Sequence, residues 1–171
     1  MYKVAITGHR PHKLIGGYNV NHASNKELKE RLKSILKEIA HNEPAILGIS
    51  GMALGVDTYF AESVLDLKEL EPKKYFLECA IPFEGQEGKW FKADQDWYHT
   101  ILSFADTKTI VSKGKYHPRL MQIRNEYMVD NCDVLIAVWD GKPNGGTYQA
   151  IQYAEKLNKT IIYVNTGVKI S

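Results

Sequence analysis

The sequence predicts an α/β fold: a doubly wound, mainly parallel sheet with helices on both faces. Short, β-branched apolar runs alternate with longer segments of helical period along the 171 residues. The central apolar runs lack polar alternation, as expected of parallel strands that helices cover on both sides. No repeat, low-complexity tract or linker divides the chain. We therefore expect one domain over residues 1–171, which is an ordinary domain length.

Six apolar runs are predicted to be strands. Each is short and contains the β-branched or aromatic residues that favour strands. In chain order the runs are Val4–Thr7, Ala45–Ser50, Tyr75–Ile81, Thr107–Val111, Val134–Val138 and Thr160–Val164. The fourth is the weakest of the six. Crossover connections between these strands should be right-handed.

Segments of helical period fill the gaps between the strands. In the first gap, Ser24–Glu27 has the sequence of a capping box, in which a hydroxyl and a carboxylate each bind a free amide. Apolar residues then follow on one helical face: Leu28, Leu32, Ile35, Leu36 and Ile39. Four further helices are predicted, over Ala53–Leu67, Trp97–Phe104, Pro118–Asn131 and Thr147–Leu157.

Composition and charge exclude several classes of protein. Hydrophobic residues make up 44% and charged residues 25%, which excludes a disordered chain. The net charge is only +2, with basic and acidic residues interleaved, so we expect no nucleic-acid partner. Cys79 and Cys132 lack the spacing of a disulfide framework or a zinc site and are expected to be buried thiols. No apolar run is long enough to cross a membrane and no secretory signal is visible, so we expect a cytoplasmic protein without membrane contact.

Residues suited to ligand binding follow the predicted strands. Open α/β sheets bind ligands at the carboxyl ends of their strands, so these residues are expected to share one edge of the sheet. The candidate ligand-binding residues are Gly8, His9, Arg10, Ser50, Gly51, Met52, Gly55, Asp57, Pro82, Phe83, Glu84, Arg124, Asn125, Trp139, Asp140, Gly145, Gly146 and Thr147. No metal site is expected, because the histidines lack metal-ligand spacing.

The segment Ser50–Asp57 is a glycine-punctuated turn from a strand to a helix. Gly51 and Gly55 would permit a tight turn and a close approach of the backbone. The helix start would offer free amides to a phosphate, and Asp57 could accept hydrogen bonds from a ribose. The pattern is neither G-x-G-x-x-G nor a Walker A sequence. A plain packing turn, with Asp57 favoured only by the helix dipole, is the alternative.

A second anion-receptive helix start is predicted at Gly145–Thr147. Two such starts on one sheet edge suit a ligand with two phosphates, or with a phosphate and a sugar. Arg10 could bind a phosphate through two nitrogens or be an ordinary surface side chain, and His9 could be a proton donor or a structural loop residue. Arg124 is either a solvated helix side chain or a site residue. Trp139 is either part of the core or a surface on which a base stacks.

Five motifs, in order along the chain, together resemble the YpsA-like branch of the SLOG superfamily, which is common in Firmicutes and their phages. They are Thr7–Pro11, Ser50–Asp57, Pro82-Phe83 with Gln86 and Trp90, Arg124-Asn125 with Met128–Asp130, and Asp140-Gly141 with Gly145–Thr147. The resemblance covers the chain from Lys3 to Val164. It implies a Rossmann-like fold that binds nucleotides or nucleotide-derived ligands, and it implies self-association into a homo-oligomer. We expect no required cofactor.

The resemblance extends to proteins with different functions. The Ser50–Asp57 turn is similar to one in DNA-processing protein A, which binds single-stranded DNA. Residues Arg124–Ala154 are similar to nucleoside 2-deoxyribosyltransferases, and the Gly-Gly-Thr turn to phosphoribohydrolases of the lonely-guy type. Both enzyme groups carry a Glu within a few residues of that turn. Here the first acidic residue after Thr147 is Glu155, so a copy of the glycosyl-ester mechanism is not expected.

The leading hypothesis is a protein that binds a nucleotide-derived small molecule of the ADP-ribose or cyclic-nucleotide type. Such a protein would sense or sequester its ligand, and in a phage it could counteract a nucleotide-based host defence. One alternative is a hydrolase or transferase acting on an N-glycosidic or phosphoester bond, for which Asp57, Glu84 and Asp140 are the candidate carboxylates. Single-stranded DNA binding is the third. Whether residues 86–97 form a lid over the site is left open.

Overall fold

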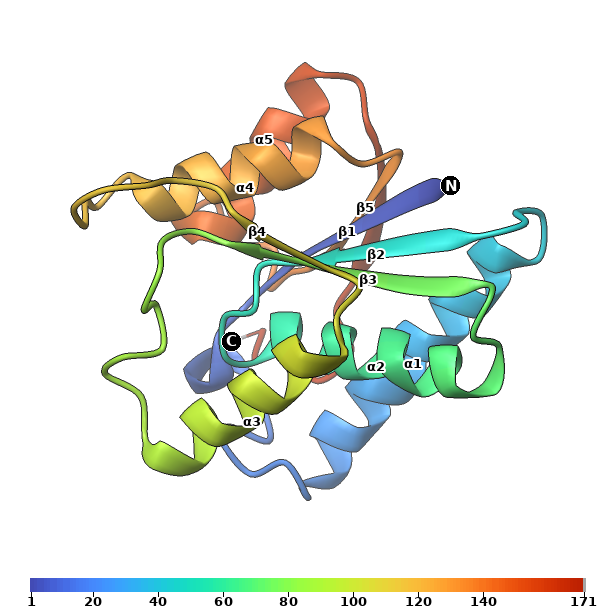
Figure 1. The fold of residues 1–171 in the computed structure, drawn as a ribbon, viewed down its shortest axis with the longest axis horizontal. Coiled ribbons are helices and arrows are strands. Elements are labelled where there is room, and N and C mark those ends of the chain that lie inside the picture. Colours follow the sequence, from blue (N-terminus) through green and yellow to red (C-terminus); the bar gives the residue numbers. More distant parts are fainter. Residues whose placement is uncertain (171) are drawn as a thin grey trace.

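The computed structural model describes residues 1–170 and contains a six-stranded parallel sheet between two helical layers (Figure 1). The sheet order is β4-β3-β2-β1-β5-β6. The strands are β1 (Tyr2–Gly8), β2 (Ile46–Ser50), β3 (Tyr75–Ile81), β4 (Thr107–Ile110), β5 (Val134–Val138) and β6 (Thr160–Val164). The helices are η1 (Pro11–Lys13), α1 (Ala23–Ala40), α2 (Val56–Leu70), α3 (Lys92–Phe104), α4 (Leu120–Asp130) and α5 (Gly145–Lys156). The predicted fold class is confirmed.

The order of the strands creates a switch point between β1 and β5. From β1 to β4 the sheet grows in one direction, and β5 and β6 then lie on the other side of β1. Helices α1, α2 and α3 cover one face, whereas α4 and α5 cover the other (Figure 1). The connections after β1 and β5 therefore leave the sheet toward opposite faces. Such a divergence opens a crevice at the carboxyl ends of the two strands.

The core lies on both faces of the central strands. All five residues of β5 are buried, as are Val4, Ala5 and Ile6 of β1. The predicted apolar face of α1 packs into the same core, with Leu28, Leu32, Ile35 and Leu36 buried. The weakest predicted strand, β4, is an edge strand with exposed residues at its start. Within residues 1–170, no helix combines the length and the apolar character that a membrane span requires.

Helix α1 begins in a different way from the prediction. Its N-cap is His22, whose Nδ1 accepts a hydrogen bond from the amide of Ser24 at 3.0 Å. The first helical residue is Ala23, so Ser24 lies inside the first turn and cannot cap it. The predicted capping box is therefore wrong: the ring nitrogen of His22, rather than the carboxylate of Glu27, accepts from the Ser24 amide.

The other helix boundaries shift by a few residues. Helix α2 begins at Val56 rather than Ala53, because Met52 and Gly55 adopt φ angles of +58° and +93° that interrupt a helix. Helix α3 begins at Lys92 rather than Trp97. Helix α4 begins at Leu120, after a turn that contains Pro118, and α5 begins at Gly145.

Candidate functional site

A cleft of about 310 Å³ lies at the switch point, between the segments that follow β1 and β5. It is lined by Ile6, Thr7, Gly8, His9, Arg10, His12, Lys13, Ala53, Asp57, Met121, Arg124, Asn125, Gly146 and Thr147. We call this set the switch-point cleft. Its volume is at the lower end of the range of roughly 300–1,000 Å³ found for small-molecule sites. The lining residues come from β1, η1, the start of α2, α4 and α5, so the fold alone brings them together.

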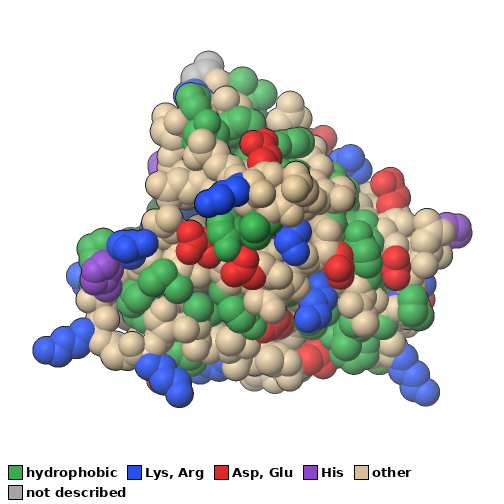
Figure 2. Space-filling view, turned by 90° about the horizontal axis from the view of Figure 1, so that it is seen from above, with side chains coloured by type: hydrophobic (Ala, Val, Ile, Leu, Met, Phe, Trp, Pro, Cys, Tyr) green, Lys and Arg blue, Asp and Glu red, His purple; other side chains and the backbone are tan. Residues whose placement is uncertain are grey.

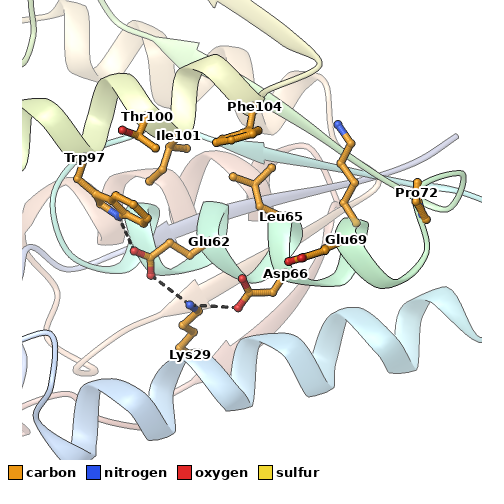
Figure 3. A pocket seen from close by; sticks show the side chains of 11 residues that line it. Lys29, Glu62, Leu65, Asp66, Glu69, Pro72, Trp97, Thr100, Ile101 and Phe104 are labelled. Carbon is orange, nitrogen blue, oxygen red and sulfur yellow. Dashed lines mark hydrogen bonds and ion pairs between the residues drawn. The ribbon is translucent and has the colours of Figure 1, made fainter.

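A larger hollow of about 610 Å³ lies elsewhere, between α2 and α3 (Figure 3). Three of its charged residues, Lys29, Glu62 and Asp66, form one ion-pair cluster. Trp97 Nε1 donates to Glu62 Oε1 at 2.6 Å, and Lys29 lies 3.5 Å from Glu62 and 3.1 Å from Asp66. The rest of the wall is largely apolar and includes Ile101 and Phe104. None of the residues expected from the sequence lines it, so we assign the candidate site to the smaller cleft.

His9 is a fixed part of one wall of the switch-point cleft. Its side chain is buried, and Nε2 accepts a hydrogen bond from the backbone amide of Asp140 at 3.1 Å. This bond uses the Nε2 lone pair and therefore assigns the proton of the neutral ring to Nδ1. Burial lowers the pKa of His9, and it outweighs the opposing effect of the Asp140 carboxylate. His9 is thus a neutral donor that joins the loops after β1 and β5.

Asp140 lies behind this wall rather than in the cleft. Burial alone would raise the pKa of its carboxyl, but the hydrogen bond from the Lys142 amide at 2.9 Å, together with the charge of Lys13, lowers it. The carboxylate Oδ2 lies 3.9 Å from Nζ of Lys13. Asp140 therefore stays ionised and holds Lys13 at the mouth of the cleft.

The start of α5 forms a cationic rim together with Lys13 and Arg10. A Cβ atom added to Gly145 would lie 3.9 Å from Nζ of Lys13, so the ammonium sits beside the first turn of α5. The N-cap Asn144 makes no side-chain capping bond, which leaves the first amides of α5 free to bind another group. Arg10 is exposed and also lines the cleft. Amides and cations in this arrangement bind anions.

Arg124 provides a buried cation at the base of the cleft. Its side chain is 4% exposed. The guanidinium donates to the carbonyl of Gly51 through NH1 and to Oδ1 of Asn125 through Nε at 2.9 Å. Within residues 1–170, no carboxylate forms an ion pair with it. A guanidinium in this position has donors left for an anion that enters the cleft.

The loop between β2 and α2 supports this arginine. Ser50 Oγ accepts from the Met52 amide at 3.1 Å and donates to the Asp57 carbonyl at 2.8 Å, which fixes the loop. A Cβ atom on Gly51 would lie 2.5 Å from NH1 of Arg124. Only glycine therefore permits this approach.

Asp57 is the carboxylate that lines the cleft. Its Oδ2 accepts from the Ala53 amide at 3.3 Å. Burial raises the pKa of its carboxyl, while the charge of Arg124 opposes the rise. The group has room for one more donor, such as a sugar hydroxyl. No cluster of three or more His, Cys, Asp or Glu suited to a metal ion occurs among the described residues.

The structure brings only part of the expected site into the cleft. Gly8, His9, Arg10, Asp57, Arg124, Asn125, Gly146 and Thr147 line it. Directly behind these lie Ser50, Gly51, Met52, Gly55, Asp140 and Gly145. Four residues lie outside: Pro82, Phe83, Glu84 and Trp139. The sequence reading missed Lys13 and His12, for which the only available signal was their place in the loop after β1.

Phe83 and Glu84, which follow β3, lie away from the switch-point cleft. The ring of Phe83 packs edge-on against that of Tyr116, with centroids 5.2 Å apart. Glu84 is exposed at the end of β3, two strands away from the switch point. The segment that follows packs inward, because Gln86 is buried and its Nε2 donates to the Gly51 carbonyl at 3.2 Å. Gln86 therefore supports the loop between β2 and α2 that contacts Arg124, and it does not line the cleft.

Protonation of His9 should destabilise the fold below neutral pH. Its folded pKa lies below the ordinary value of 6.5, so its contribution to stability is complete above pH 6.5 and is lost as the pH falls through the folded pKa. Thermal unfolding measured between pH 8 and pH 5 should show a falling midpoint. His9→Gln, whose side-chain oxygen can still accept from the Asp140 amide, should show a smaller fall. An equal fall in both proteins would contradict this assignment.

Positive and negative side chains are mixed on the molecular surface. On the face that Figure 2 shows, the basic and acidic groups are interleaved, and no broad field of one sign covers it.

Comparisons with known proteins place the chain in a family. A family model for YpsA, described as the YspA SLOG family, matches residues 4–168. The uncharacterised SPbeta prophage-derived protein YoqJ of Bacillus subtilis is 32% identical over 76% of this chain and 81% of its own length. A UPF0398 protein of Halalkalibacterium halodurans is 30% identical over 91% of this chain and 82% of its own.

Solved structures share the fold at lower identity. DNA processing protein A from Streptococcus pneumoniae is 17% identical with a TM-score of 0.65; the match covers 95% of this chain but half of that protein. The structure of DNA processing protein A from Helicobacter pylori was described for its single-stranded DNA binding mode. That protein is 20% identical with a TM-score of 0.62, and the match covers 98% of this chain and 68% of that protein. These likenesses concern the fold alone. With the match across residues 4–168, they confirm the expected family and fold: the chain belongs to the YpsA SLOG family.

Proposed function

We propose that the chain binds a nucleotide-derived small molecule in the switch-point cleft and acts as a sensor or sequestering protein. The observation that carries this proposal is the buried guanidinium of Arg124, which has no ion-pair partner among the described residues and lines the cleft. Asp57 interacts with this charge through space but forms no direct ion pair with it, and a buried cation without such a pair costs free energy. An anionic ligand in the cleft would bind the guanidinium directly. The prophage origin of one relative supports a role in the interplay of phage and host.

The residues of the cleft divide into groups with different chemistry. Arg124, Arg10 and Lys13, with the free amides of α5, would hold a phosphate. Asp57 would accept a hydrogen bond from a ribose hydroxyl. The volume of about 310 Å³ suits one sugar phosphate or one nucleotide unit. ADP-ribose and cyclic nucleotides both contain such a unit.

A thermal-shift panel tests the proposal. The panel would contain adenine and guanine nucleotides, NAD, ADP-ribose and cyclic oligonucleotides. A ligand at 100 times its dissociation constant adds about 2.7 kcal/mol, which raises the midpoint by several degrees. Gly146→Asp should abolish the shift, because its carboxylate would face the anion. The matched control is Gly146→Ala, which should retain the shift because its Cβ would make only an ordinary contact, 3.8 Å from Nδ2 of Asn125.

The same panel separates binding from turnover. Recovery of the ligand intact, as seen by mass spectrometry, supports a binding protein. Cleavage would instead assign chemistry to Asp57, the carboxylate that lines the cleft. If no ligand produces a shift, or if Gly146→Asp shifts as much as Gly146→Ala, the proposal is wrong.

Single-stranded DNA binding is the second candidate, and the likeness to the Helicobacter pylori protein favours it. This likeness weighs against our expectation that nucleic acid is not a partner. A labelled oligonucleotide titrated at physiological salt tests it. Arg10→Ala should weaken DNA binding if the strand enters the cleft, whereas Arg31→Ala, which alters an exposed arginine on α1, should have no effect. No binding of the oligonucleotide would remove this candidate.

A further inference from the structure

A second hollow lies beside the switch-point cleft, on the other side of Asp140. It has a volume of about 390 Å³ and is lined by Trp139, Asp140, Gly141, Tyr163, Val164, Asn165 and Ile170. We call it the Trp139 hollow. Asp140 lines it and also lies 3.9 Å from Lys13 of the cleft. Asp140 and Lys13 therefore connect the two cavities.

An aromatic cluster forms one wall of the Trp139 hollow. The ring of Trp139 stacks on that of Tyr148, with centroids 5.9 Å apart and planes 4° apart. Tyr163 packs against Trp139 at 6.1 Å and is 52% exposed. Trp139 Nε1 donates to the Lys142 carbonyl at 3.0 Å, which fixes the indole. Fixed aromatic rings at a surface are the groups on which nucleobases stack.

Polar groups around the rings suit the rest of a nucleotide. The exposed side chain of Asn165 has an amide donor and acceptor for the edge of a base. The Nζ of Lys13 lies 3.9 Å from Asp140 and can neutralise a phosphate that passes between the two cavities. Because the cleft holds only about 310 Å³, a ligand with a further base must extend out of it.

We infer that the Trp139 hollow is a nucleobase subsite, and that the ligand carries a base joined through phosphate to the sugar phosphate in the cleft. This inference rests on the proposed function of the cleft. Such a ligand consists of a base, a phosphate link and a second sugar phosphate. Small molecules such as ADP-ribose and the end of a nucleic-acid strand both contain these groups, and the experiment below distinguishes the two.

Trp139 itself supplies the readout. The chain has three tryptophans, so a Trp90→Phe/Trp97→Phe background leaves Trp139 as the sole indole. Ribose 5-phosphate, ADP-ribose and a 5′-phosphorylated oligothymidylate would be titrated by calorimetry and by fluorescence. Ligands with a base should quench Trp139 and bind roughly 5- to 150-fold more tightly than ribose 5-phosphate, which is the range expected for one stacked base.

Tyr163→Ala tests the subsite without touching the cleft. It should remove the gain in affinity given by the base and leave the affinity for ribose 5-phosphate unchanged. Tyr18→Ala, at a tyrosine that is 64% exposed elsewhere, is the matched control. Quenching by ADP-ribose supports a small-molecule ligand, and quenching by the oligothymidylate alone supports a strand end.

The two proposals fail in different ways. If ribose 5-phosphate binds but ADP-ribose and the oligothymidylate bind no more tightly and do not quench Trp139, the base subsite is wrong and the cleft stands. If none of the three probes binds, the base subsite is wrong, and the proposed function falls with it if no ligand of the thermal-shift panel produces a shift. Equal affinities in Tyr163→Ala and the unchanged protein would also overturn the subsite.

Discussion

Replacement of Arg124 by Met should weaken the binding of an anionic ligand by about 100-fold or more. The guanidinium is buried at the base of the switch-point cleft and has donors left over from its bonds to Gly51 and Asn125. Two charge-assisted hydrogen bonds to a phosphate, each contributing about 1.5–3 kcal/mol, account for a loss of this size. Met fills a similar volume without the charge. Calorimetry with a ligand identified by the thermal-shift panel measures the effect.

A double-mutant cycle separates the structural role of Arg124 from its binding role. The charge of Arg124 favours the ionised form of Asp57, whose pKa burial raises. Arg124→Met alone should therefore destabilise the fold at neutral pH. Asp57→Asn combined with it should restore stability, with a coupling free energy of about 0.5–3 kcal/mol. Binding should stay weak in the double variant. Recovery of tight binding together with stability would show that Arg124 acts only through the fold.

The sheet and its glycine turns could be predicted because their signals are local. A run such as Val134–Val138 has no polar alternation, and that pattern alone indicates a strand covered on both faces. The residues after each strand then share one edge of a parallel sheet, whatever the packing of the helices. This is why His9 and Arg10, on one side, and Thr147, far away in the sequence, could be expected together.

The sequence named Arg124 as a candidate site residue, but its burial could not be predicted, because it depends on packing between distant segments. A helical arginine is usually solvated. Here Gly51, which is 73 positions away in sequence, lacks the Cβ atom that would exclude the guanidinium. Trp139 was ambiguous for a related reason. The register between β5 and β6 places it against Tyr163, on the far side of Asp140 from the cleft.

The start of α1 shows a limit of another kind. Ser24–Glu27 has the pattern of a capping box, in which the Glu27 carboxylate would accept from the Ser24 amide. Instead, Nδ1 of His22 accepts from that amide, because the helix begins at Ala23 and His22 is its N-cap. A histidine nitrogen is an uncommon cap, and a rule based on Ser, Thr, Asp and Asn does not detect it. Such competition between neighbouring side chains affects where an element begins rather than whether it forms.

Replacement of Gly55 by Ala should lower the free energy of unfolding by about 2–6 kcal/mol. Gly55 has a φ of +93° and a ψ of −128° at the start of α2, a conformation that costs other residues about 1–3 kcal/mol. A Cβ atom there would also lie 2.6 Å from the carbonyl oxygen of His9, which is rigid backbone. Relieving that clash adds about 1–3 kcal/mol. Urea unfolding measures the sum.

Gly85→Ala is the matched control, because it separates backbone strain from the clash. Gly85 has a φ of +88°, but a Cβ atom there would meet nothing within 4 Å. Its replacement should cost only the strain, so the difference between the two variants reports how tightly the Gly55 turn packs on the loop after β1. The amide of Val56 donates to the same His9 carbonyl at 3.2 Å, so displacing this turn should also move His9 and Arg10. Gly55→Ala should therefore weaken ligand binding as well, whereas equal stabilities of the two variants would mean that the turn does not support the cleft.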